Sequence, residues 1–153
     1  MKESSPEGVH VWLILLKAFQ AVDKLSTEGL QASNLGESDF RVLEVLLHKG
    51  ALPVNTIGPK VNLTAGSISA AVERLHARGL VSRIEDPHDR RVRVVDLTPD
   101  GRALIQPVFR SHAALMEKVA AVLSPAERTQ LERLLKKIGH QAEALSRRSS
   151  AQA

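Results

Sequence analysis

The sequence predicts a mainly α-helical protein with one small β-hairpin. Most of the 153 residues fall into segments whose apolar residues recur at helical spacing. Two short stretches rich in β-branched residues, 81–84 and 92–97, flank a charged turn and are typical of hairpin strands. Residues that start and stop helices divide the remainder into separate helices.

The composition is that of a single globular domain, with 43% apolar and 25% charged residues. The absence of cysteine excludes disulfides, thiolate zinc sites and thiol redox sensing. The six histidines lack the carboxylate or cysteine neighbours of a metal site, so we expect neither metal nor cofactor. The longest apolar run, Val11–Leu16, cannot cross a bilayer, and the acidic start lacks the order of a secretory signal. We therefore expect a cytoplasmic protein without a membrane segment.

The first helix is expected from Val9 to about Leu30 and is apolar on several sides. A helix of this kind has to be covered on two faces. It is either a central core helix or a helix that contacts a second subunit. Its apolar residues include Val9, Trp12, Leu13, Ile14, Leu15, Leu16 and Phe19.

Three shorter helices are expected next. The first follows the turn at 35–38 and ends before Gly50. The second spans 54–61, although Pro59 within it lacks an N–H donor. The third is capped by Thr64 and ends at Gly79.

Two long helices are expected after the hairpin. Thr98-Pro99-Asp100 is a strong helix start, and the helix is expected to bend at Pro107. The segment 124–127, Ser-Pro-Ala-Glu, is a capping box that opens the last helix, whose end from Arg147 is expected to fray. Helices, a tight turn, a further helix and a hairpin in this order make a winged helix-turn-helix.

The helix after Thr64 has an outward face of small residues, opposite the apolar stripe centred on Ile68. Small side chains would let the backbone approach base edges in the DNA major groove, where hydroxyls can donate or accept. The same face also suits the plain solvent-exposed side of a packed helix. The candidate DNA-contacting residues are Thr64, Gly66, Ser67, Ser69 and Ala70.

The hairpin tip, within the stretch EDPHDRRVRVV from Glu85 to Val95, concentrates acids and arginines. An arginine at a protruding tip can enter the minor groove, and a nearby acid can fix its geometry. Asp89 is well spaced to orient Arg91. The alternative is a solvated charge cluster that blunts an exposed sheet edge.

Three short patterns follow one another from Leu63 to Arg102. They are R-L-x-x-R-G-L-V at 74–81, D-P-x-D-R-R at 86–91 and L-T-x-x-G at 97–101. In these patterns, and over roughly residues 9–147, the chain resembles the multiple antibiotic resistance regulator (MarR) family. The resemblance implies a homodimeric winged-helix transcription regulator that binds double-stranded DNA. It also implies that Arg91 is the wing-tip arginine, that Asp89 is its partner, and that Arg90 braces the wing or meets phosphate.

The resemblance further implies three regions. These are an N-terminal dimerisation helix (1–34), a winged helix-turn-helix DNA-binding lobe (35–102) and C-terminal dimerisation helices (103–153). The chain departs from the family where many relatives carry a long polar residue and it has Ala70, and where Gly58-Pro59 replaces the usual Ala-Glu. We therefore expect fewer direct contacts to base edges and a larger contribution of DNA shape to specificity.

Family members commonly respond to small aromatic or anionic molecules. We hypothesise that Trp12 and Arg41 border an effector pocket, because an indole and a guanidinium together suit an aromatic carboxylate. The alternative is a core tryptophan and a solvated arginine. The lack of cysteine excludes the oxidation-sensing branch of the family.

The expected function is thus a MarR-type repressor that binds a palindromic operator as a homodimer and is released by a small effector. The alternative is a winged-helix module for protein contact without a specific operator. An enzyme is not expected, since no nucleophile motif, phosphate-binding glycine loop or carboxylate cluster is found in the sequence.

Overall fold

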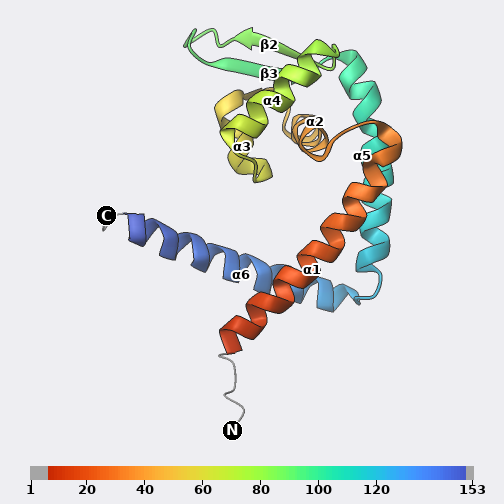
Figure 1. Ribbon diagram of the computed structural model, residues 1–153, viewed down its shortest axis with the longest axis vertical. Coiled ribbons are helices and arrows are strands. Elements are labelled where there is room, and N and C mark those ends of the chain that lie inside the picture. The colour runs from red at the N-terminus through yellow and green to blue at the C-terminus, as the bar shows by residue number, and fades with distance from the viewer. Residues whose placement is uncertain (1–6, 151–153) are drawn as a thin grey trace. The chain divides into compact units, whose positions relative to one another are not determined.

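The computed structural model describes residues 7–150 (Figure 1). The fold is mainly helical with a small antiparallel sheet, as the sequence predicts. The described residues form two compact units, one up to Leu115 and one from Met116. The elements in order are α1 (Glu7–Leu30), a short 3-10 helix (Gln31–Ser33), α2 (Glu37–Lys49), β1 (Leu52–Pro53), α3 (Val54–Val61), α4 (Ala65–Ala77), β2 (Val81–Glu85), β3 (Arg93–Leu97), α5 (Pro99–Ala120) and α6 (Pro125–Ser150).

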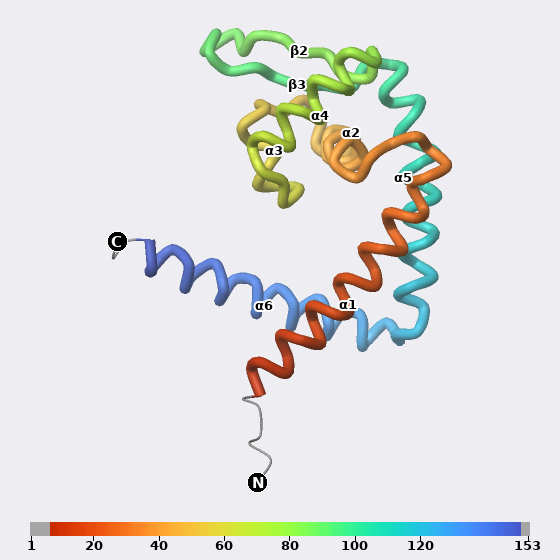
Figure 2. The backbone as a smooth tube through the Cα atoms, viewed as in Figure 1, coloured from red at the N-terminus to blue at the C-terminus, as the bar shows by residue number. Residues whose placement is uncertain are grey.

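The core of the first unit forms around α2, which packs against α3, α4 and β3 (Figure 2). The apolar stripe of α2 is buried because its residues recur every three to four positions and face these neighbours. Ile105, near the start of α5, completes this core. The fully buried side chains include Val42, Leu43, Leu46, Ile57, Ile68, Leu75, Val81, Val95 and Ile105.

Helix α3 forms at the predicted position although Pro59 lies inside it. Tertiary packing compensates for the missing donor, since Ile57 and Gly58 are buried. A Cβ on Gly58 would lie 2.9 Å from the backbone oxygen of Leu63, so only glycine permits this close turn. Asn62 then takes the left-handed conformation (φ 55°) that turns the chain toward α4.

The sheet has three strands in the order β1-β3-β2, one more than the predicted hairpin. The hairpin pairs Val81 with Leu97 and Glu85 with Arg93, close to the predicted strand bounds. The extra strand, β1, pairs Leu52 with Val95. Two residues are too few to show a strand periodicity, which explains why the sequence gives no sign of β1. Beyond the three-stranded part of the sheet, β2 and β3 project past α4 as a hairpin, which we call the wing (Figure 1).

The start of α5 is fixed on the turn between α4 and β2. Thr98 caps the helix by accepting a hydrogen bond from the Gly101 N–H at 3.0 Å, and its hydroxyl donates to the Gly79 carbonyl at 2.7 Å. The Thr98 N–H also donates to the Leu80 carbonyl at 3.1 Å. A Cβ on Gly101 would lie 1.9 Å from that same carbonyl oxygen. The glycine of the L-T-x-x-G pattern is therefore required by this contact, because the space beside the Leu80 carbonyl leaves no room for a side chain.

Within the second unit, the predicted capping box at the start of α6 is confirmed. The Ser124 N–H donates to Glu127 Oε2 at 2.8 Å, and the Glu127 N–H donates to Ser124 Oγ at 3.3 Å. The predicted fraying from Arg147 is wrong up to Ser150, because α6 stays helical to that residue, and the remainder lies outside the described residues.

Pro107 lies inside an uninterrupted α5. None of the helices within residues 7–150 combines the length and the hydropathy that a membrane-spanning helix requires.

Candidate nucleic-acid interface

Helix α4 begins with the predicted cap. Thr64 Oγ1 accepts a hydrogen bond from the Ser67 N–H at 3.1 Å and donates to Ser67 Oγ at 2.9 Å. Both side chains are exposed at the helix start, where free backbone N–H groups and the positive end of the dipole favour an anion such as a DNA phosphate. This end of α4 can thus position the helix on a DNA backbone.

The outward face of α4 is exposed, and its N-terminal end carries small residues, as the helical projection predicts. Ile68, Ala71, Val72 and Leu75 are buried on the opposite side. A Cβ on Gly66 would meet nothing within 4 Å. The glycine is therefore not required by the lobe's own packing. The exposed residues of this face include Gly66, Ser69, Ala70, Glu73 and Ala77.

The wing tip is a loop built by two aspartates. Asp86 Oδ1 accepts from the N–H groups of His88 and Asp89, at 2.7 and 3.1 Å, which closes a local turn. Backbone bonds from the Asp86 N–H to the Val92 oxygen and from the Val92 N–H to the Asp89 oxygen, both 2.9 Å, close the base of the loop. The tip therefore has a defined conformation that can present side chains.

Asp89 holds Arg91 through a two-pronged contact. Asp89 Oδ1 accepts from Arg91 Nε, and Oδ2 from Nη2, both at 3.1 Å, while the Arg91 N–H adds a third bond at 3.0 Å. The Arg91 side chain is 90% exposed. A planar guanidinium held in this way has a fixed orientation. The predicted spacing of this pair is confirmed as a contact, and Arg90 lies exposed beside it.

This contact also shifts both titrations. The hydrogen bonds from Arg91 hold the pKa of the Asp89 carboxyl below its ordinary value. The same contact raises the pKa of the Arg91 guanidinium. Both side chains reach solvent, with Arg91 90% and Asp89 40% exposed, so the shifts express local hydrogen bonding rather than burial. The pair stays ionised throughout the neutral pH range.

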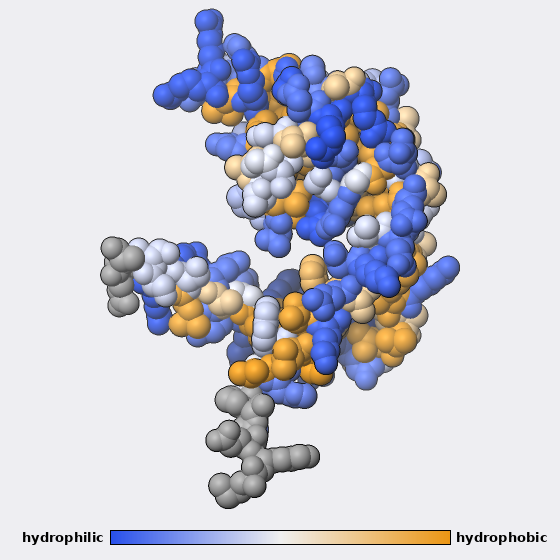
Figure 3. Space-filling view, viewed as in Figure 1, coloured by the Kyte–Doolittle hydropathy of each residue, from blue (hydrophilic) through white to orange (hydrophobic). Residues whose placement is uncertain are grey.

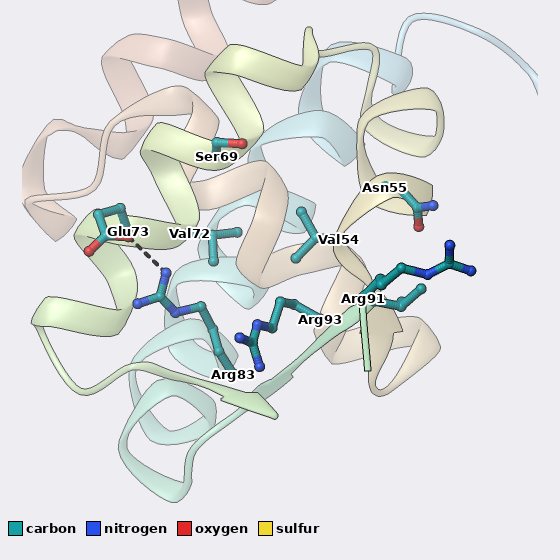
Figure 4. A pocket seen from close by; sticks show the side chains of 9 residues that line it. Val54, Asn55, Ser69, Val72, Glu73, Arg83, Arg91 and Arg93 are labelled. Atoms are coloured by element: carbon teal, nitrogen blue, oxygen red, sulfur yellow. Dashed lines mark hydrogen bonds and ion pairs between the residues drawn. The ribbon is translucent and has the colours of Figure 1, made fainter. Parts of the chain in front are cut away.

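A groove of about 340 Å³ lies between α4 and the wing (Figure 4). Ser69 and Glu73 line it from α4, and Arg83, Arg91 and Arg93 line it from the hairpin. The groove thus brings together one candidate of the helix, Ser69, and one of the wing, Arg91. Each of the three arginines pairs with a carboxylate at 2.7 to 3.1 Å, so the groove presents guanidinium groups held in place rather than an excess of positive charge.

A charged contact that the sequence does not predict fixes α4 on α2. Asp39, at the start of α2, is buried, and its Oδ1 accepts from Arg74 Nη2 at 2.6 Å and Nε at 3.2 Å. Ser38 Oγ accepts from the same Nη2 at 3.1 Å. The hydrogen bond that Arg74 donates to Asp39 raises the pKa of the Arg74 guanidinium. The acid after the α2 start and the arginine of the R-L-x-x-R-G pattern were visible, but their 35-residue separation hides the pairing.

The two candidate effector residues lie apart. Arg41 donates to the Val61 carbonyl at 3.1 Å and to Asp23 Oδ1 at 3.4 Å, and it also pairs with Glu37. Trp12 is 56% exposed and lies 11 residues before Asp23 on α1, which is about 16 Å along the helix axis. The alternative of a core tryptophan and a solvated arginine is wrong for this chain, because Trp12 is exposed and Arg41 is paired and mostly covered. In the part of the chain that is described, no three His, Asp or Glu side chains are placed to hold a metal ion.

Comparison with known proteins decides the family. A model of the MarR family matches residues 33–92, the segment from the end of the 3-10 helix to the loop of the wing. The HTH-type transcriptional regulator MhqR of Bacillus subtilis is 32% identical over 133 residues, which cover 87% of this chain and 92% of MhqR. The chain belongs to the MarR family of DNA-binding transcription regulators. The resemblance seen in the three short patterns is thereby confirmed.

Solved structures of MarR-family regulators agree in fold. The Bordetella bronchiseptica protein BpsR, whose DNA binding is regulated by 6-hydroxynicotinic acid, is 31% identical, with a TM-score of 0.76 over 85% of this chain and 98% of BpsR. A MarR variant from E. coli in complex with operator DNA is 24% identical, with a TM-score of 0.77 over 86% of this chain and 95% of that one. These relatives are transcription regulators rather than enzymes.

Proposed function

We propose that this MarR-family chain is a repressor that binds a palindromic operator as a homodimer and is released by a small aromatic or anionic effector. The exposed Arg91 clamped by Asp89, across a groove from the small face of α4, carries the proposal. The small face of α4 would lie along the major groove and the arginine would enter the adjacent minor groove. The proposed DNA contacts are Thr64, Gly66, Ser67, Ser69, Ala70, Asp89, Arg90 and Arg91.

The homodimer is supported by apolar surface that a single chain leaves exposed. Trp12, Ile14 and Phe19 of α1 are each more than half exposed. Helix α6 has no buried residue within Pro125–Ser150, yet it carries its own apolar stripe. Figure 3 shows apolar residues gathered over α1 and over α6, whereas hydrophilic residues cover the wing. The stripe of α6 is formed by Leu131, Leu134, Leu135, Ile138 and Leu145.

A second copy of the chain is the occupant that both faces fit. Obligate dimers bury about 2,000 Å² or more in largely apolar interfaces, and two apolar helices per subunit can supply such an area. We assign residues 1–34 and 103–153 to dimerisation and 35–102 to DNA binding. Two identical reading heads require two identical half-sites, about 34 Å apart for one helical turn of DNA. The operator would then be an inverted repeat.

The proposed effector is an aromatic carboxylate, and Trp12 and Arg41 are its candidate contacts. The ligand response of BpsR, a relative of similar length, supports this class of molecule. A carboxylate ligand at Arg41 would have to displace Asp23 or Glu37, which already pair with it. Trp12 is the single tryptophan of the sequence, so its emission reports on α1 alone. Titration of a panel of aromatic acids should change that emission, and silence across the panel would count against an effector.

Selection from a randomised duplex library tests the DNA-binding proposal. We expect the purified protein to migrate as a dimer and to enrich an inverted repeat. Affinity should fall linearly with salt on logarithmic axes, with a slope of about 0.9 for each neutralised phosphate. A monomer that enriches no sequence and responds flatly to salt would favour the alternative, a module for protein contact. DNA as the partner also implies a cytoplasmic location.

A further inference from the structure

One acidic residue, Glu73, lies on the outward face of α4 that is proposed to contact DNA. Glu73 lies on the same exposed helix face as Ser69, one turn further along and about 6 Å away in rise. Its side chain is 68% exposed and lines the groove between α4 and the wing. A carboxylate that faces phosphates lowers DNA affinity at every sequence, because like charges repel. An acid at this place therefore needs a specific partner.

Arg83 holds this acid in one position. Its Nη1 lies 2.7 Å from Glu73 Oε2 (Figure 4). Its Nη2 lies 3.5 Å from His76 Nδ1. The Arg83 side chain is 34% exposed, half the value for Glu73. The arginine thus forms the inner part of the pair and the glutamate the outer part. The ion pair joins α4 directly to strand β2.

The hairpin explains why Arg83 points this way. Side chains alternate between the two faces of a strand, so Val81, Arg83 and Glu85 share a face. Val81 is fully buried at the root of the wing, which directs this face toward α4. Arg83 then emerges where the apolar packing ends. Its position is set by the core and not by a flexible tip.

We propose that Glu73 reads a base, with Arg83 as the residue that positions it. This inference rests on the proposed DNA-binding function. An ionised carboxylate has about four lone-pair sites, so the bond to Arg83 leaves capacity for another donor. In the major groove the amino group of cytosine is the donor that glutamate pairs with best. The neighbouring Ala70 is small and leaves the carboxylate free access to the base edge.

The chain supplies a matched control in the same wing. Glu85 and Arg93 form a second ion pair, also 2.7 Å long, with side chains 51% and 54% exposed. Glu85 lies on β2 and outside α4. Glu85→Gln removes the same charge as Glu73→Gln without altering the α4 face. The two variants therefore separate base reading from charge removal.

The experiment is selection from a randomised duplex library with the wild type, Glu73→Gln and Glu85→Gln. We expect the wild type and Glu85→Gln to enrich the same motif. Glu73→Gln should lose the preference at one C·G pair of each half-site, by about 5- to 150-fold, on the scale of one good base contact. Both glutamine variants should bind random duplex more tightly than the wild type, since each removes one negative charge.

A charge swap tests the role of Arg83. The double variant Glu73→Arg with Arg83→Glu keeps an ion pair but places the cation on the helix. If the pair only braces the wing, the swap restores the wild-type motif, and the inference is overturned. Base reading by Glu73 requires that the motif stays altered at the same position.

Two further outcomes would also overturn the inference. One is that Glu73→Gln enriches the wild-type motif unchanged. Glu73 would then only neutralise the charge of Arg83 and would contact no base. The other is that the wild type enriches no motif, which removes the operator-binding function and this inference with it. The wild-type selection alone therefore distinguishes failure of the function from failure of the role given to Glu73.

Discussion

The contact between Gly101 and the Leu80 carbonyl gives the sharpest stability test. In Gly101→Ala the new Cβ would lie 1.9 Å from the Leu80 oxygen and 2.9 Å from the Leu80 carbonyl carbon, both backbone atoms that cannot rotate away. Over-packing of this kind costs about 1 to 3 kcal/mol. The shift would also break the bond from the Thr98 N–H to the Leu80 oxygen, which contributes about 1 kcal/mol. Alanine regains about 1 kcal/mol of helix propensity. Because a 1.9 Å overlap lies at the upper end of the over-packing range, the free energy of unfolding is expected to fall by about 2 to 3 kcal/mol.

Urea unfolding at one fixed protein concentration measures this loss, because the stability of a dimer depends on concentration. Gly66→Ala is the matched control, since it lies in the same unit and in a helix, and its Cβ would meet nothing within 4 Å. The control should be unchanged or stabilised by up to about 1 kcal/mol. Equal midpoints for Gly101→Ala and wild type would refute the packing argument for this glycine.

The remaining predictions concern α4 and the wing. Gly66→Ala should weaken operator binding although stability is kept, since the added methyl group stands between the helix backbone and the base edges; a gel-shift titration at fixed salt checks this, and unchanged affinity contradicts it. Asp39→Asn should lower the free energy of unfolding by about 1 to 2 kcal/mol, a charge-assisted hydrogen bond discounted because Arg74 is half exposed. The depressed pKa of Asp89 means that its contact with Arg91 is complete above the ordinary carboxyl pKa and is lost only as pH falls through the lower folded value. The affinity ratio of wild type to Asp89→Asn should therefore be the same at about pH 5.5 and 7.5, well above an ordinary aspartate pKa, and a ratio that shrinks at the lower pH would show that the carboxyl titrates there.

Local rules predicted the helices and the hairpin from the sequence. Thr64, Thr98 and Ser124 each form the cap expected of their residue type, because capping depends on atoms three residues away. The Asp89–Arg91 contact was predictable for the same reason, since it spans two residues. Helix α3 formed against the local preference of Pro59 because burial of its neighbours outweighs one lost donor.

Contacts between distant segments were not predictable. The pairing of β1 with β3 joins residues more than 40 positions apart, and a two-residue strand carries no pattern of its own. The Asp39–Arg74 bond likewise depends on how α2 crosses α4. Glu73 was visible on the outward face of α4, but its restraint by Arg83 follows from the register of the hairpin. Trp12 and Arg41 share suitable chemistry, whereas the length of α1 separates them.

The role of Arg91 at the wing tip is the central claim, and Arg91→Ala tests it most directly. Equilibrium titration of the selected operator should show affinity about 5- to 150-fold weaker than wild type and a salt slope lower by about 1, with an unchanged melting temperature. The melting temperature should hold because the side chain is 90% exposed and supports no core contact. Wild-type affinity in this variant, or a fall in melting temperature without loss of binding, would contradict the assignment of the wing to DNA.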